Sequence, residues 1–505
     1  MKGYATFFLT AVMTLGLVFL LVTRARKDHP APAIDPAFIE VAASPDAGDG
    51  GAEGGTAVAI ADAAPEAAAP VKPAERPLRV AALGWELVAA GVALTAPDGG
   101  ATGTTIELAP ETTLDAIEAR LARGGSDPVG ADVAILPLPS FVVAYDRLRA
   151  LDPRAFAVVG FSHGREEVHA SGGALLKPPP GADEVKLVAL GPATAGDATA
   201  KAAGTESATM LGLFALDLLG VAPSRVRMIA PGAADAKAAA FSAIARGAAD
   251  ERKLAFSSAD ASRFVPIVVV APKKLLDESE PKLRELTKSW LEGLERSRKD
   301  ASNIARRLAN KEALPLGAGV GGAPETIALL ERLGQIEPVT LAQQRVYIGA
   351  NATGAVTLES LAQRTWVLAR AGGLTTSATP SPLPLDDRIA TAIAPAPPAK
   401  AAPEGDAGAA DAGAFAALPT GTTPLVLYRA VDAQADAASV AAQIGFLAGV
   451  FEHAAFRVSA KGGDKAARAI AAQARDRFGL DSSRLTTAAG EPAGAFAAVE
   501  VVSLP

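Results

Sequence analysis

Short apolar runs alternate with amphipathic segments through the middle of the chain. Six of these runs have the length of buried strands: LRVAAL (78–83), DVAILPL (132–138), FAVVGF (156–161), VKLVAL (185–190), RVRMIA (225–230) and VPIVVV (265–270). Segments with helical spacing separate most of them, namely TTLDAIEARLARGG, the run 210–219, DAKAAAFSAIARG and the long stretch that begins SEPKLRELTKSWLEGLE. Strands that alternate with helices predict α/β layers on a largely parallel sheet.

A second alternating set occupies the end of the chain, over 424–505. PLVLYRA, FRVSAKGGD, SRLTTAAGE and FAAVEVVSLP have the pattern of strands, whereas SVAAQIGFLAGVFEH and KAARAIAAQARDRFG have the pattern of helices. We therefore expect a separate, small α+β domain there.

Two segments rich in Ala, Pro, Gly and Asp flank the central region. Residues 28–77 and 375–423 contain few large apolar side chains, so we expect linkers there and a folded domain over 78–374. Before the first linker, residues 4–23 hold an apolar run about as long as the ~20 residues that span a bilayer. The run ends in TRARK without a cleavage signature, which predicts an uncleaved single-pass anchor.

Composition narrows the chemistry. The chain has 505 residues, half of them apolar, a net charge of −7, four histidines and no cysteine. A length of this kind predicts two to four domains. The absence of cysteine rules out disulfides and thiolate ligands, and we expect no metal site and no cofactor. Blocks of positive charge occur only at Arg24–Lys27 and in a helix near Arg296–Arg307, so no nucleic-acid surface is expected.

The order of segments from 78 to 344 resembles the substrate-binding proteins of ABC importers, in the group that binds nitrate, sulfonates, taurine and thiamine precursors. The resemblance rests on LRVAALGW, ADVAILPLPSFVVAYDRLRAL, FAVVGFSHGREEVHA, VKLVALGPATAG, GTESATMLGLFALDLLGVAPSRVRMIA and PIVVVAPKKLLDESEPKL, taken as an ordered set. It implies a type II periplasmic-binding fold, with two α/β lobes and a second lobe at about 166–263. It also implies non-enzymatic capture of a small, anionic ligand in the cleft.

The same resemblance implies a set of ligand-binding residues: Trp85, Ser140, Ser162, His163, Arg165, Thr205 and Ser207. Thr205 and Ser207 open an apolar helix, where hydroxyls and free amides hold an anion's oxygens. Each residue also has an ordinary structural interpretation. The two hydroxyls are typical helix caps, Trp85 is typical of a packed core, and Arg165 is typical of a solvated surface charge.

The tail domain resembles the peptidoglycan-associating domain of OmpA-type proteins. FRVSAKGGD and GLDSSRLTTAAGEPAG carry this likeness. The resemblance makes Asp464 the peptidoglycan-binding aspartate. Ile470 stands about where the family's arginine belongs, so we expect the OmpA-like domain to bind peptidoglycan weakly or not at all.

The sequence leaves three functions open. The first is a solute-binding protein in the inner membrane, with its soluble domains in the periplasm, that serves an ABC importer permease or a sensor. Three cations after the anchor, against Lys2 before it, favour the opposite orientation. The second is an envelope scaffold without ligand. The third is an α/β-hydrolase that uses Ser162, because GFSHG fits G-x-S-x-G. Its base would be His169, seven positions away, or His453 in the tail domain.

Overall fold

The computed structural model describes residues 76–95, 105–172, 184–190, 205–245, 248, 250–312, 314, 323–349, 355–394, 425–430 and 435–503. The predicted anchor at 4–23 and nearly all of the linker at 28–77 lie outside these residues. Within them, no helix combines the length and the hydropathy that a membrane span needs. All of them belong to one compact unit, Ala74–Pro505.

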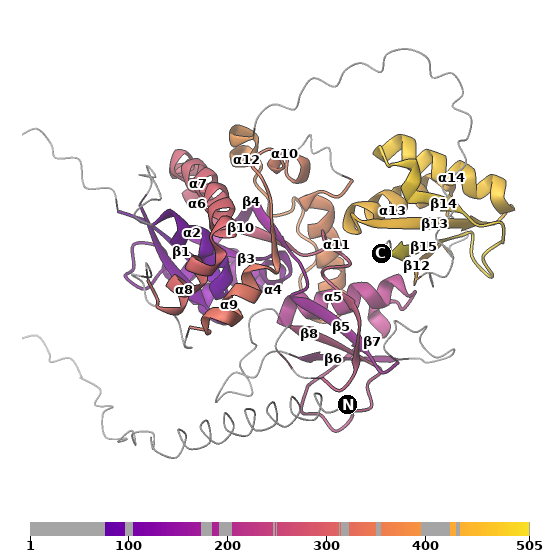
Figure 1. The fold of residues 1–505 in the computed structure, drawn as a ribbon, viewed down its shortest axis with the longest axis horizontal. Helices are drawn as coiled ribbons and strands as arrows, with labels where there is room; N and C mark the ends of the chain where they lie inside the picture. Colours follow the sequence, from indigo (N-terminus) through magenta and orange to yellow (C-terminus); the bar gives the residue numbers. More distant parts are fainter. Residues whose placement is uncertain are drawn as a thin grey trace, which may run out of the picture. The chain divides into compact units, whose positions relative to one another are not determined.

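The first lobe is built on a six-stranded mixed sheet (Figure 1). Its order is β11-β4-β10-β3-β1-β2, with β1 (Leu78–Leu83), β2 (Ile106–Glu111), β3 (Val133–Pro137), β4 (Pro153–Ser162), β10 (Pro266–Pro272) and β11 (Ile336–Pro338). β1 pairs in parallel with β2 and β3, whereas β10 is antiparallel to both β3 and β4. Therefore β1, β3 and β4 run in the same direction, and their carboxyl ends share one edge of the sheet.

The second lobe has its own five-stranded sheet. Its order is β7-β6-β8-β5-β9, with β5 (Glu166–Ala170), β6 (Val185–Leu190), β7 (Val226–Ile229), β8 (Phe241–Ala245) and β9 (Lys253–Ser257). Two segments cross between the sheets: residues 163–165 lead from β4 to β5, and residues 258–265 lead from β9 to β10. All six predicted strands of the central region are present. The division into two lobes with the second at about 166–263 stays a prediction; the structure has two separate mixed sheets.

One predicted helix of the second lobe is wrong. The segment DAKAAAFSAIARG contains β8, which pairs with β6 on one side and β5 on the other. All five residues of β8 are buried, and Ser242 Oγ donates to Asp250. Alanine fits a helix and a tightly packed strand equally well in size, and here the pairing on both sides decides the conformation. The residues after GFSHG form strand β5, so no helix follows this motif.

Helices cover both faces of the first sheet and create two apolar cores. Val80 and Ala82 of β1 face the core formed with α2 (Ala89–Leu94), α7 (Glu280–Lys299), α8 (Ala301–Ala309) and α9 (Thr326–Leu333). Ala81 and Leu83 face the core formed with α3 (Leu114–Arg123) and α4 (Leu138–Leu148). This alternation is the two-residue period of a strand buried on both sides.

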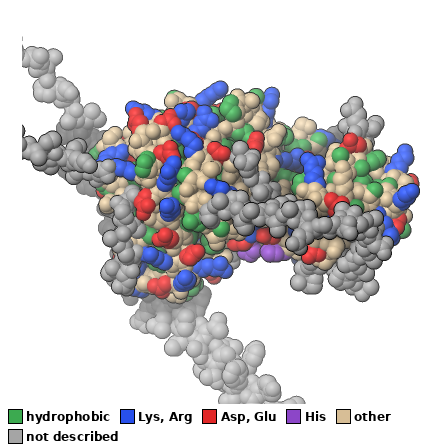
Figure 2. Space-filling model, turned by 90° about the horizontal axis from the view of Figure 1, so that it is seen from above, with side chains coloured by type: hydrophobic (Ala, Val, Ile, Leu, Met, Phe, Trp, Pro, Cys, Tyr) green, Lys and Arg blue, Asp and Glu red, His purple; other side chains and the backbone are tan. Residues whose placement is uncertain are grey.

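The basic stretch near Arg296–Arg307 does not present charge of one sign. Arg307 is only 8% exposed and donates to the carbonyl of Val92 at 2.7 Å, while Arg296 lies 3.9 Å from Glu292. On the face shown in Figure 2, acidic and basic side chains are interspersed.

One long helix contacts both lobes. α11 (Leu358–Ala371) packs against α4 of the first lobe and against α5 (Thr205–Leu218), the helix that covers the second sheet. Trp366 is fully buried, with its ring 6.3 Å from that of Phe141 and 5.5 Å from that of Tyr145, both on α4. On the other side, Arg364 forms an ion pair with Asp217 of α5. Thus α11 joins the lobes at a second place besides the crossing segments.

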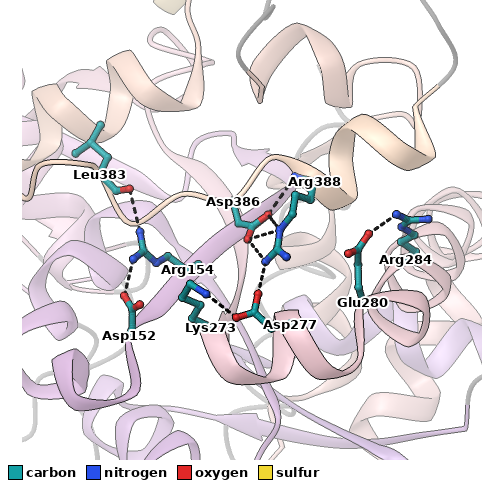
Figure 3. Close-up of polar contacts among 9 residues, drawn as sticks. All are labelled: Asp152, Arg154, Lys273, Asp277, Glu280, Arg284, Leu383, Asp386 and Arg388. Carbon is teal, nitrogen blue, oxygen red and sulfur yellow. Dashed lines mark hydrogen bonds and ion pairs between the residues drawn. The ribbon is translucent and has the colours of Figure 1, made fainter.

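Residues 375–394, assigned to a linker by composition, fold onto the first lobe (Figure 3). Ala155 of β4 donates its N–H to Pro384 and accepts one from Asp386, at 3.0 and 2.9 Å. Arg388, at the start of α12 (Arg388–Ile393), reaches both Asp386 and Asp277, at 2.6 and 2.9 Å. The low apolar content of this stretch is offset by ion pairs and by strand-like hydrogen bonds to β4.

The tail domain has the elements that its pattern predicts. Its sheet order is β12-β15-β13-β14, with β12 (Leu425–Ala430), β13 (Ala454–Ala460), β14 (Leu485–Thr487) and β15 (Ala497–Ser503). α13 (Ala437–Val450) and α14 (Gly463–Phe478) accompany this sheet and pack against each other.

The end of α13 contacts the second crossing segment. The N–H of Arg263 donates to the carbonyl of Val450 at 3.1 Å, and the Arg263 guanidinium pairs with Glu452 as well as with Glu337 of β11. Phe451 is 1% exposed, and its ring centroid lies 5.9 Å from that of Phe256 and 6.4 Å from that of Phe214. The tail domain is therefore packed on the segment that connects the lobes.

Candidate functional site

Polar side chains gather where the parallel strands of the first lobe end. Trp85 and Glu86 follow β1, Ser140 lies in the first turn of α4 directly after β3, and Ser162 ends β4. Ligands of open α/β sheets bind outside the carboxyl ends of such strands. The predicted residues Trp85, Ser140 and Ser162 are thus at one edge of one sheet.

Glu86, in the loop after β1, forms an ion pair with Arg165 of the first crossing segment. Arg165 Nη2 lies 2.6 Å from Glu86 Oε1, and the two side chains are 10% and 3% exposed. Glu86 Oε2 and Arg165 Nη1 are buried and have no hydrogen-bond partner among the described residues. Gly84 makes the turn possible, because its φ is 119° and a Cβ there would lie 2.5 Å from Glu86 Oε1. Sequence reasoning proposed Arg165 and missed Glu86, although it lies next to the predicted Trp85.

Ser162 lies in a closed network at the start of the first crossing segment. It is fully buried, and its hydroxyl donates to Glu166 Oε2. Burial raises the pKa of the Glu166 carboxyl, which is 1% exposed, against the opposing effect of Arg165. The N–H groups of Arg165 and Glu166 donate to Ser258 Oγ at 3.1 and 3.3 Å. These bonds tie one crossing segment to the other.

The surroundings of Ser162 contradict the hydrolase alternative. A nucleophile elbow requires a strand, a sharp turn and a helix, whereas GFSHG connects strand β4 to strand β5. His169 is not its base, since its ring nitrogens lie 3.0 Å from Arg252 O and 2.8 Å from Glu167 Oε2. The Ser162 hydroxyl is hydrogen-bonded to a carboxylate inside the protein. Ser162 is therefore a structural residue in this arrangement.

Ser140 and Ser207 are completely enclosed. Both are 0% exposed, and neither hydroxyl has a hydrogen-bond partner among the described residues. They occupy the first turns of α4 and α5, the helices that meet between the lobes. Thr205 begins α5 and is partly buried. Trp85, 1% exposed, is part of the core and its Nε1 is also without a partner.

The start of α5 lies near charged groups of the first lobe. A hydrogen bond to Glu118 is the main reason why the pKa of Arg147 is raised, and the charges of Asp115 and Glu206 add to this effect. Arg147 belongs to α4, whereas Glu206 belongs to α5 of the second lobe. The first turn of α5 therefore lies near α4 of the first lobe.

A cavity of about 540 Å³ opens beside this edge. Glu86 and His163 line it together with side chains of α7, α9 and β11 and with His453 of the tail domain. Of the predicted ligand-binding residues, His163 lines this cavity, whereas Ser140, Thr205 and Ser207 do not.

The described residues contain no group of three or more His, Asp or Glu arranged to hold a metal ion. The two histidines at the cavity therefore have no ligand set around them that would complete a metal site.

Asp464 lies in the first turn of α14. The hydroxyl of Thr487 donates to it at 2.7 Å, and Arg468 pairs with it at 2.8 Å. The Thr487 hydrogen bond, followed by that from Arg468, lowers the pKa of Asp464. Ile470, at the position where the OmpA-type arginine was sought, is 1% exposed and belongs to the core.

Comparison with solved structures finds distant similarity to ligand-binding components of import systems. One is the ligand-binding component of an ABC-type import system from Staphylococcus aureus with zinc bound, 11% identical, covering 63% of this chain and 99% of that chain at a TM-score of 0.39. Another is the periplasmic aliphatic sulphonate binding protein SsuA from Escherichia coli, with 14% identity, 60% and 90% coverage and a TM-score of 0.37.

The desulfurization enzyme DSZB is also similar, with 10% identity, 62% and 98% coverage and a TM-score of 0.33. No protein-family model matches the chain, and no curated protein matches it. At this level of similarity the two-lobed description depends on the sheet orders and crossing segments of this chain itself.

Proposed function

We propose that this chain is a solute-binding protein that captures a small anionic ligand between its two lobes without a chemical step. The N-terminal anchor would hold it at the inner membrane, with the folded domains in the periplasm, where it serves an ABC-type importer or a sensor. Its topology supports this proposal, because two crossing segments join two α/β sheets in the way that domain closure around a ligand requires.

The observation that carries the proposal is a set of buried donors without acceptors. Ser140 Oγ, Ser207 Oγ and Arg165 Nη1 are enclosed and have no hydrogen-bond partner among the described residues. Buried polar groups in proteins are normally satisfied, so unmet donors between two lobes favour a missing acceptor. An oxyanion supplies several acceptor oxygens, and helix starts such as those of α4 and α5 favour negative charge.

A thermal-shift screen of the full-length chain in detergent tests this function. The probes are phosphate, sulfate, nitrate, alkanesulfonates and thiamine precursors. A ligand at 100 times its dissociation constant stabilises the folded state by about 2.7 kcal/mol. Ser207→Ala and Ser140→Ala should reduce that stabilisation, whereas Ser289→Ala, at a buried serine of α7, should leave it unchanged. The absence of any shift would contradict ligand capture.

A second candidate, an envelope scaffold, is favoured by the way the lobes are held. α11 packs on both lobes, and the tail domain packs on the second crossing segment, so two sets of contacts resist a change in lobe orientation. In this function the Asp464 region would contact peptidoglycan only weakly, since Arg468 already pairs with that carboxylate. The ligand screen separates the candidates, because a scaffold should show no thermal shift with any probe, and sedimentation with purified peptidoglycan should recover little or none of it in the pellet.

A further inference from the structure

The cavity beside Glu86 is large enough for a small molecule. Its volume of about 540 Å³ falls within the range of ligand sites in proteins, which is roughly 300–1,000 Å³. It takes lining residues from three parts of the chain: α7–α9 and β11 of the first lobe, His163 of the first crossing segment and His453 of the tail domain. It is therefore a site that the two lobes alone do not complete.

Two carboxylates line this cavity. Glu86 is 3% exposed, and its Oε2 has no hydrogen-bond partner among the described residues. Glu337 lies 2.5 Å from Arg263, and this hydrogen bond is the main cause that lowers the pKa of the Glu337 carboxyl. Glu337 is thus a carboxylate at neutral pH. His163 and His453 are close enough to it to contribute to the same lowering.

The rest of the wall is largely apolar. The apolar lining residues are Ala89, Leu294, Ala301, Leu330, Leu333, Ile336 and Pro338. Among the described lining residues Arg298 carries the one guanidinium, and it is exposed at the end of α7. The cavity therefore combines a hydrophobic wall with two carboxylates, of which Glu86 pairs with Arg165 and Glu337 with Arg263, and Glu86 Oε2 has no hydrogen-bond partner among the described residues.

We propose that this cavity binds an amphipathic amine, whose ammonium group donates to Glu86 Oε2 and Glu337 and whose hydrocarbon part lies on Leu294, Leu333 and Ile336. Burial of an unpaired carboxylate oxygen is costly, and a cationic donor meets that need best. Arg165 and Arg263 each pair with one of these glutamates, so repulsion of a carboxylate or sulfonate head is reduced, and the preference for an amine rests on the unpaired Glu86 oxygen. The apolar wall provides the hydrophobic part of the affinity.

This site differs from the cleft assigned to the anionic ligand. Ser140 and Ser207 do not line it, whereas the tail domain contributes His453. The two proposals share the Glu86–Arg165 ion pair, and variants away from that pair, Glu337→Gln and Ser207→Ala, distinguish them.

Titration calorimetry of the full-length chain with n-hexylammonium tests the proposal, with hexanoate and 1-hexanol as probes of the same length. We expect hexylammonium to bind at least about tenfold more tightly than either, since hydrogen bonds to charged groups contribute about 1.5–3 kcal/mol. Glu337→Gln and Glu86→Gln should each weaken hexylammonium by about tenfold. Glu331→Gln, an exposed α9 residue outside the cavity, is the matched control.

His453→Arg separates a binding role from a structural one. The added positive charge should weaken hexylammonium and leave 1-hexanol unchanged, whereas a structural defect would weaken both probes. Ser207→Ala should leave hexylammonium binding intact even if it abolishes the response to anions. The proposal is overturned if hexylammonium does not bind, if hexanoate or 1-hexanol binds as tightly, or if Glu337→Gln has no effect while the unfolding midpoint is unchanged.

Discussion

Truncation of Phe451 should release the tail domain from the second lobe. Phe451 follows α13 in the tail domain, but its ring packs on Phe256 of β9 and Phe214 of α5. Its backbone carbonyl also accepts from Arg484 at 2.7 Å, which fixes the turn that presents the ring. Phe451→Ala keeps this backbone bond and removes the ring, so it tests the contact between domains and not the turn.

The expected cost is about 4 kcal/mol, because Phe→Ala at a fully buried site costs about 3–5 kcal/mol. Phe451 is 1% exposed, which places it at such a site. A double-mutant cycle with Phe214→Ala should give a coupling energy of about 1 kcal/mol, since aromatic pairs contribute about 0.5–1.5 kcal/mol beyond buried area.

Guanidinium unfolding of the full-length chain, followed by tryptophan fluorescence, measures both quantities. All three tryptophans, Trp85, Trp290 and Trp366, lie outside the tail domain. Far-ultraviolet circular dichroism reports the tail domain as well, and in Phe451→Ala the two signals should give separate transitions. Phe478→Ala is the control, because that ring lies against Gly445 within the tail domain.

Two results would refute this reasoning. The first is additivity of Phe451→Ala and Phe214→Ala within about 0.5 kcal/mol, which is the behaviour of residues that do not touch. The second is a coupling energy between Phe214 and Phe478 equal to that between Phe214 and Phe451. The coupling would then reflect a general effect on stability and not a contact between the two rings.

Three further changes test other parts of the molecule. Gly449→Ala should loosen the tail domain, because the added Cβ would lie 2.5 Å from Val356 Cγ2 and 2.9 Å from Val356 N. Gly490→Ala is the control, because its Cβ would meet no atom within 4 Å. Equal resistance of the two variants to proteolysis would contradict this packing. Burial raises the pKa of Glu166, so its stabilising effect is present below the ordinary glutamate pKa and is lost as pH rises through the raised value. Glu166→Gln should therefore gain stability relative to the parent as the pH rises above the ordinary glutamate pKa of about 4.3, and a pH-independent difference would disprove this. Asp217→Asn should lower the free energy of unfolding in urea by about 2 kcal/mol, because it weakens a charged hydrogen bond to Arg364. An unchanged free energy of unfolding would show that this ion pair does not stabilise the contact between α11 and α5.

The sequence predicts the strands correctly where they are rich in Val, Ile and Leu. The runs that became β1, β3, β4, β6, β7 and β10 are of this kind, and their periodicity distinguishes them from the surrounding helices. β8 could not be found in this way, because FSAIA lies in an alanine-rich segment and only its pairing with β5 and β6 makes it a strand. The fold of residues 375–394 was hidden for a similar reason. Its support comes from ion pairs with Asp277 and hydrogen bonds to Ala155, which local composition does not reveal.

The candidate site was predictable only in part. The resemblance named Trp85, Ser140 and Ser162, and the structure places them after β1, after β3 and at the end of β4, at one edge of the sheet. The cavity was missed because Glu337 and His453 come from distant segments that meet only through tertiary packing. A charged residue directly after a buried strand was the one available signal for Glu86. The sequence contains no corresponding signal for the contact of Arg263 with Glu452.

The contacts of α11 with both lobes determine how the lobes can move apart. Trp366 is held by α4 and Arg364 by α5, so a wide swing would have to strip this helix from one side before the other could turn. Such a step is an all-or-none detachment and not a smooth hinge, since packed cores have discrete arrangements. Amide protons along 361–369 should then exchange with solvent in one cooperative event, and a molecule trapped between the lobes would slow that exchange.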